Sequence, residues 1–381
     1  MKILVLTLSF GSGHVRAAEV IASELKQQAP NADVLIVDAL AGCRTLFRAG
    51  YVWPYWAVVR YAPGLWARYF AARVSRMDQQ TAPAWAFRWG CPRVFKAISE
   101  SAPDLIVATE VAACELAVLA KRAGLTNARL VNVITDHEAE PVWVKPEVDG
   151  YAVADEGVRT ALSSWGAATN KMLVCGIPTD PDFRALHDQR ETRTRYGLLD
   201  DAPVVLLMGG GMGPTHMDEV AAFLLKSGQR IQIIAIAGRD RRMRRRLDRL
   251  HPLPRIPLRI LDWTDDIAAL MQTASVLITK PGGLTTAEAA VCGLPLVMFD
   301  AIPGPEERNA ARLLAAGAGV MTSNASDTAA AALALLDDEQ MRRRMSSCAA
   351  MHARPEASVL IAQYALAGLM RTGARVRGAT A

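Results

Sequence analysis

Short apolar runs recur along the whole chain, and stretches of helical periodicity separate them. In the first half these runs are Ile3–Leu8, Val34–Val37, Leu105–Ala108, Leu130–Ile134 and Tyr151–Val153. The helical patterns between them are His14–Gln28, Val111–Arg122 and Glu156–Trp165. The apolar runs are continuous rather than alternating, as is typical of strands covered on both faces. This order of elements predicts an α/β fold with parallel sheets and crossover helices.

The alternation stops near residues 175–181 and then starts again. Pro178 and Pro181 make a continuous helix unfavourable there, so we place a domain boundary near residues 178–190. The later apolar runs are Val204–Met208, Ile231–Ala237, Leu258–Leu261, Val276–Ile278, Leu296–Phe299 and Val320–Thr322. The sequence therefore predicts two domains, residues 1–180 and 181–381, each with ligands at the carboxyl ends of its strands. Residues 329 to about 370 are predicted to be helical, with a frayed tail at residues 372–381.

Composition narrows the class of protein. Hydrophobic residues make up 51% of the 381 residues and charged residues 21%, which is typical of well-filled globular cores. No apolar run approaches the roughly 20 residues needed to span a bilayer. Ile3–Leu8 is too short for a signal peptide and leads into glycines instead of a cleavage site, so we expect a cytoplasmic protein.

The cysteines form no CxxC pair, which argues against a zinc site and a disulfide framework. They are Cys43, Cys91, Cys114, Cys175, Cys292 and Cys348.

A glycine loop, Phe10–His14, follows the first predicted strand and opens a helix. Its glycines, Gly13 among them, let backbone N–H groups approach a bound group closely. The loop lacks part of the dinucleotide-binding fingerprint and has no P-loop lysine. Both absences argue against a protein that binds NAD or hydrolyses ATP. His14 lies where the loop becomes helix, and a neutral imidazole there can accept a proton from an attacking hydroxyl. The alternative is a helix-capping loop with an incidental histidine.

A second glycine cluster, Gly209–Gly213, directly follows the run Val204–Met208. Four glycines in five residues at a strand end indicate a backbone that comes close to a ligand, and a phosphate or a reacting sugar is the natural candidate. The candidate residues are Gly211, Met212 and Gly213, and a flexible turn is the alternative. Gly238 and Arg239 end the next strand, where they could contact a nucleotide or merely cap the strand.

Two further loops follow predicted strands of the second half. In the first, Gly282, Gly283, Leu284 and Thr285 open a helix, and Glu288 is predicted to lie in its first turn. Backbone and hydroxyl donors there suit a diphosphate, and a carboxylate can accept both hydroxyls of a ribose. In the second, Glu306, Glu307 and Asn309 lie at the start of another helix. Its acids could hold sugar hydroxyls, or could be ordinary first-turn acids favoured by the helix dipole.

These loops carry a resemblance to a known family. The stretch from Trp263 to Ala311, with TKPGGLTTAEA and PGPEERNA, resembles the donor-binding half of the GT-B glycosyltransferases that make glycolipids. These are the processive diacylglycerol glucosyltransferases and the monogalactosyldiacylglycerol synthases. GSGH and the stretch around Asp136, Trp143 and Asp149 resemble the acceptor half. The similarity covers about residues 1–325, apart from an aromatic segment near residues 45–95.

The resemblance implies a GT-B fold of two Rossmann-like domains facing across a cleft, with an acceptor domain at residues 1–180 and a UDP-sugar domain at residues 181–381. It implies inverting transfer of a hexose from a UDP-sugar to diacylglycerol, without a metal ion or other cofactor. His14 would be the base, with Asp136 close to it. The donor residues would be Gly282, Gly283, Thr285 and Glu288 for the nucleotide, Glu306 and Asn309 for the sugar, and Gly211 to Gly213 near the reaction centre.

Two positions depart from the family pattern. Pro305 stands where the family usually has a glutamine, so one hydrogen bond to a sugar hydroxyl is either lost or supplied by another residue. Glu140 stands where the family often has a histidine, and His137 lies nearby instead. The identity of the sugar and the assignment of the base both depend on these positions.

Residues 44–96, which we call the insert, combine aromatic and basic side chains. Five of the tryptophans lie there, Trp53, Trp56, Trp66, Trp85 and Trp89, among eight arginines. Aromatic rings favour the headgroup boundary and basic side chains an anionic leaflet, so we expect the insert to dock on an anionic membrane surface. The alternative is a tryptophan-rich helical hairpin packed on the sheet. No RNA-binding motif accompanies these residues, so we expect no nucleic acid partner. A basic run at residues 239–246 is predicted to be a solvated helix face.

The leading interpretation is therefore a glycosyltransferase that acts at the cytoplasmic face of a membrane. Transfer to another lipid acceptor, hydrolysis or epimerisation of UDP-sugars, and a non-catalytic sensor of UDP-sugars are the alternatives.

Overall fold

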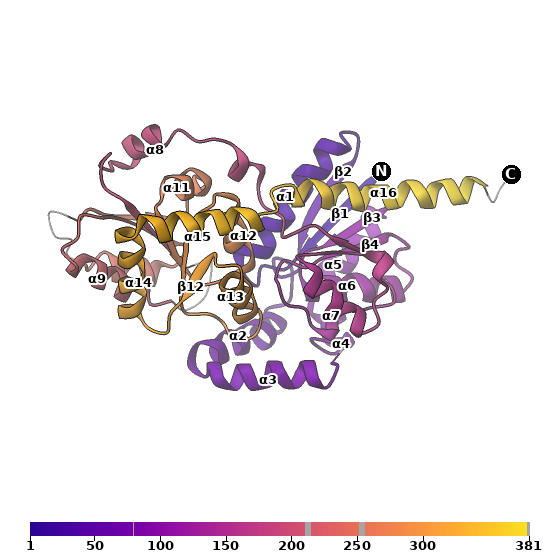
Figure 1. Cartoon of the computed structure of the whole chain (residues 1–381). Helices are drawn as coiled ribbons and strands as arrows, with labels where there is room; N and C mark the ends of the chain where they lie inside the picture. The colour runs from indigo at the N-terminus through magenta and orange to yellow at the C-terminus, as the bar shows by residue number, and fades with distance from the viewer. Residues whose placement is uncertain (79, 210–214, 251–255, 379–381) are drawn as a thin grey trace. The chain divides into compact units, whose positions relative to one another are not determined.

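The computed structural model describes residues 1–78, 80–209, 215–250 and 256–378 (Figure 1). The chain forms two compact units. The first comprises Met1–Thr179 and Glu356–Ala381, and the second comprises Asp180–Pro355. The change of unit after Thr179 agrees with the boundary expected near residues 178–190.

The first unit contains a parallel sheet with the strand order β2-β1-β3-β4-β5-β6. Its strands are β1 (Lys2–Thr7), β2 (Asp33–Asp38), β3 (Leu105–Ala108), β4 (Arg129–Val133), β5 (Gly150–Val153) and β6 (Met172–Val174). The parallel α/β prediction is confirmed, and five of these strands overlap the predicted runs. Sequence reasoning missed β6, an edge strand of three half-buried residues that carries too little apolar signal.

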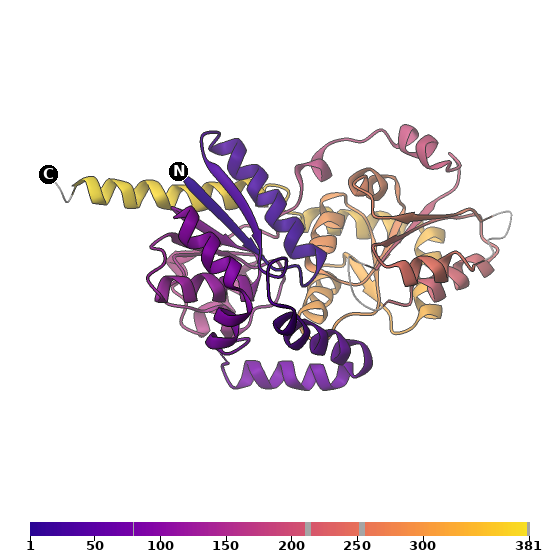
Figure 2. The same cartoon turned by 180° about the vertical axis from the view of Figure 1, so that it is seen from behind.

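Helices cover both faces of this sheet. One face packs on α1 (Ser12–Gln28) and α16 (Ala357–Gly378), which lie side by side (Figures 1 and 2). On the other face, α6 (Val111–Arg122) contacts β1 and β3, α7 (Glu156–Ser164) contacts β5 and β6, and α5 (Pro92–Ser101) packs on α6. The continuous apolar strands predicted such two-sided burial.

The C-terminal helix corrects the predicted division into domains. We expected all of residues 181–381 in the second domain, but α16 belongs to the first unit. Its residues Ile361 and Ala365 are fully buried in the core that α1 shares with β1, β3 and β4. The reason is that α1 alone leaves part of this sheet face uncovered, and an apolar helix stripe removes that surface from water. The helix continues to Gly378, past the predicted end near Met370.

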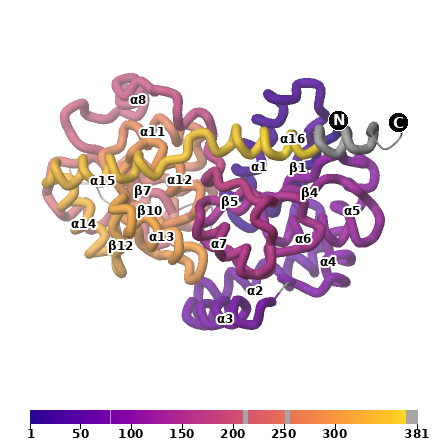
Figure 3. Tube along the Cα trace, turned by 45° about the vertical axis from the view of Figure 1, so that its right-hand side comes forward, coloured from indigo at the N-terminus to yellow at the C-terminus, as the bar shows by residue number. Residues whose placement is uncertain are grey.

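The insert is helical and lies between β2 and β3. It consists of α2 (Thr45–Tyr61), α3 (Pro63–Ser75), α4 (Ala84–Gly90) and the start of α5, and α2 packs on α3 (Figure 3). Phe10, from the loop after β1, contacts the rings of Tyr51, Tyr55 and Trp56 on α2. These ring contacts hold the insert against the loop that leads to His14.

The second unit is built in the same way around the strand order β12-β11-β10-β7-β8-β9. Its strands are β7 (Val204–Met208), β8 (Gln232–Gly238), β9 (Leu258–Asp262), β10 (Val276–Thr279), β11 (Leu296–Met298) and β12 (Gly319–Met321). One core packs the sheet on α9 (Met217–Lys226), α10 (Arg241–Leu247) and α14 (Ala325–Asp337), with α15 (Glu339–His352) at its edge. The opposite core packs it on α11 (Ile267–Thr273), α12 (Gly283–Val291) and α13 (Pro305–Ala315), and α8 (Gln189–Tyr196) contacts α11.

Each sheet has a point at which the strand order reverses. In the first unit it lies between β1 and β3, and in the second between β7 and β10. At such a point two neighbouring loops diverge to opposite faces, and open α/β sheets bind their ligands there. The loops of His14 and Thr109 lie at the first point, and those of Gly209 and Lys280 at the second. Within the described residues, no helix combines the length and the apolar character needed to cross a bilayer.

Candidate active site

His14 lies in the first turn of α1, just after the loop that leaves β1. Its Nδ1 is 3.1 Å from the Thr109 carbonyl oxygen at the end of β3 and 3.2 Å from Thr135 Oγ1 at the end of β4. Because a carbonyl oxygen only accepts, Nδ1 carries the proton and Nε2 is the basic nitrogen. Burial lowers the pKa of His14, and the charge of Asp136 opposes this effect. The result is a neutral imidazole with an acceptor nitrogen, as a general base requires.

The surrounding residues fix this arrangement. Thr109 Oγ1 donates to the His14 carbonyl oxygen at 3.0 Å and lies 3.0 Å from Thr7 Oγ1, which joins the ends of β1 and β3. Asp136 acts on the pKa of His14 through its charge, so the structure brings these two predicted residues together. Gly13 precedes His14 within α1.

His137 and Glu140, at the positions that depart from the family pattern, are both paired. His137 Nδ1 is 2.8 Å from Asp155 Oδ2, and Glu140 Oε2 is 3.0 Å from Arg73 Nη2 on α3. Burial raises the pKa of Glu140, and the Arg73 charge opposes this. Neither side chain is among the hydrogen-bond partners of the His14 ring. Of the two histidines, His14 is the one held by the ends of β3 and β4, beside the point where the strand order reverses.

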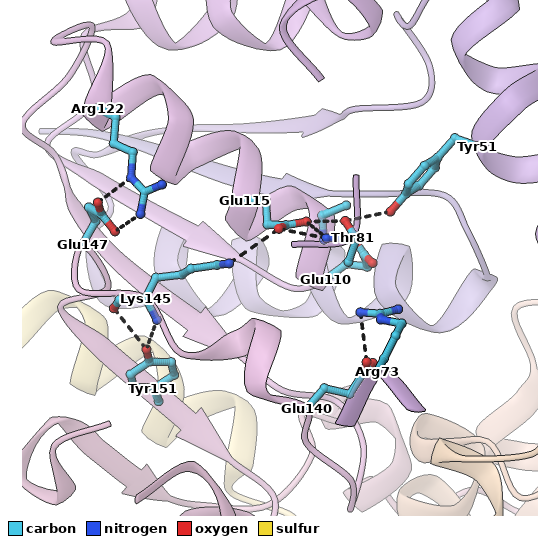
Figure 4. A network of polar contacts seen from close by, with 11 residues as sticks. Tyr51, Arg73, Thr81, Glu110, Glu115, Arg122, Glu140, Lys145, Glu147 and Tyr151 are labelled. Carbon is cyan, nitrogen blue, oxygen red and sulfur yellow. Dashed lines mark hydrogen bonds and ion pairs between the residues drawn. The ribbon is translucent and has the colours of Figure 1, made fainter. Parts of the chain in front are cut away.

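Sequence reasoning missed a cluster of buried carboxyl groups beside this site (Figure 4). Glu110, at the end of β3, caps α6 by accepting the amides of Ala112 and Ala113 at 2.7 and 3.1 Å. Burial raises the pKa of Glu110 to about 8. Glu115 accepts hydrogen bonds from Thr81 and lies 3.5 Å from Lys145 Nζ. Glutamates in an apolar helix give no signal of this cluster, because only the tertiary structure shows that they are buried.

In the second unit, the loops after β10 and β11 are tied together. Lys280 Nζ is 2.7 Å from Glu306 Oε1, and Glu306 Oε2 accepts the Ile302 amide at 2.7 Å. Asn309 is fully buried and donates its side-chain amide to the Pro281 carbonyl oxygen at 3.0 Å. Glu306 and Asn309, predicted at the start of a separate helix, therefore contact the glycine turn through Lys280 and Pro281. The Lys280 partner is an addition that the TKPGG motif could have suggested.

The glycine turn opens α12. Gly282 is the N-cap, and the first amides of the helix, those of Gly283, Leu284 and Thr285, have no intrahelical acceptor. These amides and the helix dipole favour an anion. A Cβ atom at Gly282 would lie 3.8 Å from Glu306 Oε1, so the Glu306 carboxylate lies close to the turn.

Glu288 lies one turn further along than predicted. It is the sixth residue of α12, in the second turn, because the helix begins at Gly283 and not later. Its side chain is buried. Thr286, the next residue after Thr285, directs its hydroxyl to the carbonyl oxygens of Gly282 and Gly283 at 3.0 and 2.9 Å.

Six predicted donor-site residues remain: three glycine-cluster residues, the pair at the end of β8, and Glu307. Gly211, Met212 and Gly213 lie outside the described residues. Gly238 ends β8 with φ +60°, and the Arg239 guanidinium lies 4.5 Å from the centre of the Trp263 ring. Glu307 accepts the Gly304 amide at 3.0 Å and so caps α13, which agrees with the alternative of an ordinary helix-start acid. In the basic run, Arg244 pairs with Asp248 and Asp262 on the surface.

A second histidine–aspartate pair, also missed, lies after β7 and β11. Asp300 accepts the His216 backbone amide at 2.7 Å and lies 3.0 Å from His216 Nδ1. Asp300 has φ +53°, a backbone conformation that aspartate tolerates better than most residues. The pair ties the start of α9 to the loop after β11.

Both units of the chain are similar in sequence to known glycosyltransferases. The sequence profile of monogalactosyldiacylglycerol (MGDG) synthase matches residues 14–179, and that of glycosyl transferases group 1 matches residues 219–351. Processive diacylglycerol beta-glucosyltransferases from Bacillus mycoides and Bacillus cereus are each 25% identical over 326 residues, which covers 86% of this chain and 83% of theirs.

Solved structures show the same fold. Anabaena Alr3699/HepE in complex with UDP-glucose aligns with a TM-score of 0.60 and 18% identity, over 97% of this chain and all of that one. UDP-GlcNAc 2-epimerase from Neisseria meningitidis aligns with a TM-score of 0.65 and 13% identity over the same shares. The fold is thus common to transferases and epimerases, and the sequence matches distinguish between them. Those matches extend across both units, and they support a UDP-sugar glycosyltransferase of the GT-B fold that is similar to the glycolipid-synthesising enzymes.

Proposed function

We propose that this protein transfers a hexose from a UDP-sugar to diacylglycerol at an anionic membrane surface, with inversion and without a metal ion. The observation that carries the proposal is His14, whose Nδ1 is held by the Thr109 carbonyl oxygen at 3.1 Å. The basic Nε2 lies at the point where the strand order reverses, in the part of the chain that matches the MGDG synthase profile. A hydroxyl acceptor needs such a base.

In this proposal the donor binds the second unit. The amides of Gly283, Leu284 and Thr285 hold the diphosphate, and Gly282 allows its close approach. Glu288 binds the ribose, while Glu306 and Asn309 lie near the hexose. Relatives support this assignment, since the Anabaena protein was solved with UDP-glucose. Gly211, Met212, Gly213, Gly238 and Arg239 remain predicted donor contacts.

The reaction follows from these groups. The acceptor hydroxyl oxygen attacks the anomeric carbon of the hexose as the bond from that carbon to the UDP oxygen breaks. The hydroxyl proton passes to His14 Nε2, and UDP leaves with the bonding electron pair. Attack from the side opposite to the leaving group inverts the anomeric centre. The amides of α12 and the Lys280 ammonium group meet the charge on the leaving diphosphate, which is the role that a metal ion would otherwise fill.

The insert supplies the membrane contact in this proposal. Its helices bury Phe47, Phe70 and Phe87 and expose a different set of aromatic residues. The exposed set is Trp53, Tyr61, Tyr69, Trp85 and Trp89, with Leu46 and Leu65. Large exposed apolar side chains beside arginines are typical of an interfacial surface, and the charge suits the anionic cytoplasmic leaflet. The helical-hairpin alternative explains only the buried set.

One incubation tests the activity. Purified protein is mixed with several UDP-sugars and with vesicles that contain diacylglycerol, and the lipids are analysed by mass and by anomeric configuration. We expect a monohexosyl diacylglycerol of inverted configuration, whose rate EDTA does not change. A retained configuration, or a rate abolished by EDTA, contradicts the mechanism. UDP binding without any lipid product favours the sensor, and a different glycosylated lipid favours the other acceptor.

Two variants test the two sites separately. Glu288→Ala should weaken UDP binding measured by calorimetry about tenfold or more, because a ribose loses a charged acceptor. Trp53→Ala with Trp85→Ala should weaken vesicle binding and leave UDP affinity unchanged. If the tryptophan variant sediments with vesicles like the wild type, the insert is not the docking surface.

A further inference from the structure

The insert is connected to the acceptor site by buried polar contacts (Figure 4). Arg73, on α3 of the insert, is only 8% exposed and forms an ion pair with Glu140, whose side chain is 14% exposed; Arg73 Nη2 lies 3.0 Å from Glu140 Oε2. Thr81, which follows α3, donates its amide to both oxygens of Glu115 at 3.1 and 3.0 Å. Tyr51, on α2, donates its hydroxyl to Thr81 Oγ1 at 3.2 Å. Three parts of the insert thus contribute to one network.

The contacts of the insert involve, directly or through Glu115, one segment of the first unit. Glu140 belongs to residues 134–149, which connect β4 to β5 and which we call the β4–β5 segment. Lys145, in the same segment, lies 3.5 Å from Glu115, which Thr81 also contacts. The insert therefore holds this segment at two positions, directly through Arg73 and indirectly through Glu115.

The same segment contains the polar contact of the candidate base. Thr135 Oγ1 lies 3.2 Å from His14 Nδ1, and Asp136 acts on His14 through its charge. Only five positions separate Thr135 from Glu140. A shift of the segment at Glu140 therefore reaches the group that orients the imidazole.

The exposed end of this connection lies on the proposed docking surface. Tyr69 is 48% exposed on α3, and the Arg73 guanidinium lies 5.9 Å from the centre of its ring. Contacts thus run from the exposed ring through Arg73 to Glu140, and the β4–β5 segment that contains Glu140 also contains Thr135, which contacts His14. The ion pair is weak evidence of a purely stabilising role, because a buried pair is often no more stabilising than apolar residues of similar volume.

We propose that Arg73 is a positioning residue of the acceptor site, which transmits docking of the insert on a lipid surface to the β4–β5 segment. Docking orders the insert, the Arg73–Glu140 pair orders the segment, and the segment fixes Thr135 and Asp136 around His14. The base is then fully oriented only at a lipid surface, where diacylglycerol is present. This inference rests on the membrane docking in the proposed function.

Hydrogen–deuterium exchange on the full chain tests the coupling. The protein is measured with and without vesicles of phosphatidylcholine and phosphatidylglycerol, in the absence of donor and diacylglycerol. We expect vesicles to slow exchange in residues 44–96 and also in residues 134–149. In Arg73→Met, vesicles should still slow exchange in residues 44–96 but no longer in residues 134–149. Arg76→Met removes the same charge from an exposed position near the end of α3, where Arg76 pairs with Asp78, and should behave like the wild type.

The outcomes separate this inference from the proposed function. If vesicles protect the insert of the wild type but not residues 134–149, the coupling is wrong and the docking stands. If vesicles do not protect the insert, the docking fails and this inference fails with it. If Arg76→Met loses protection of residues 134–149 as Arg73→Met does, general charge and not the buried pair is responsible, which overturns the assignment to Arg73.

Kinetics provide a second measurement. Arg73→Met should lower kcat on vesicle-borne diacylglycerol about tenfold or more, while UDP affinity and vesicle binding stay within about twofold, since the donor unit and the exposed aromatic residues are unchanged. A parallel loss of UDP affinity would indicate general damage and overturn the inference. If Arg73→Met does not fold, the double variant Arg73→Met/Glu140→Met replaces the pair by apolar side chains and must show the same loss of coupling.

Discussion

Replacement of Glu110 by glutamine should stabilise the protein at neutral and alkaline pH. Glu110 is 7% exposed, and burial raises its pKa from the ordinary value of 4.5 to about 8. Neighbouring Glu115 and Glu140 add to this rise, and no cation is among its causes. Glutamine can still accept the two α6 amides through its carbonyl oxygen, but it never has to ionise in the core.

The sign follows from proton binding in the two states. Between pH 4.5 and about 8, the unfolded chain has lost the Glu110 proton while the folded protein retains it. The free energy of unfolding therefore falls as pH rises through this range and becomes constant above it. At about 1.4 kcal/mol for each pH unit, the loss reaches at most about 3.5 kcal/mol at pH 7 and about 5 kcal/mol above pH 8.

Urea denaturation from pH 5 to pH 8.5 measures this effect. The difference in unfolding free energy between Glu110→Gln and the wild type should grow with pH in favour of the variant. Glu19→Gln is the matched control, because Glu19 lies on the exposed side of α1. A Glu110→Gln difference that stays constant across this pH range would refute the reasoning, since the buried carboxyl group would then not be titrating with a raised pKa.

Three further predictions concern the base, the donor loop and the C-terminal helix. His14→Ala should lower kcat by about 10²- to 10⁴-fold with UDP affinity unchanged, and an unchanged kcat would exclude His14 as the base. The acidic limb of the wild-type pH–rate profile should lie below pH 6.5, because burial lowers the pKa of His14. Lys280→Met should weaken UDP-sugar binding about tenfold or more in calorimetry, since it removes a cation from the anion site and leaves Glu306 without its cationic partner. An unchanged affinity would exclude a role of Lys280 in binding the diphosphate. Ile361→Ala should lower the free energy of unfolding of the first unit by about 2–5 kcal/mol, because this residue is fully buried between α16 and the sheet; a change below about 1 kcal/mol in urea denaturation would contradict the packing of α16.

The sequence alone determined the architecture and the location of the glycine loops that follow the strands of the second unit. Apolar runs such as Val204–Met208 are long, continuous and bounded by glycine, so they predict central parallel strands from local pattern alone. Glycines that precede a helix, such as Gly282 and Gly283, mark an anion-binding turn for the same local reason. The signal lies within a few neighbouring residues, and the structure places the turn where the strand order reverses.

The partners of each functional side chain were decided only by the tertiary structure. The Thr109 carbonyl that sets the His14 tautomer is 95 positions away in sequence, and the Glu140 carboxylate that pairs with Arg73 is 67 positions away. In the sequence Glu115 looks like an ordinary helical glutamate and Glu110 like an ordinary residue at a helix start, and only the folded structure shows that both are buried. The return of α16 to the first sheet likewise depends on which surface remains uncovered after the other helices have packed. Burial and long-range pairing are properties of the folded chain as a whole, because they arise from the free energy of removing surface and charge from water and not from local sequence.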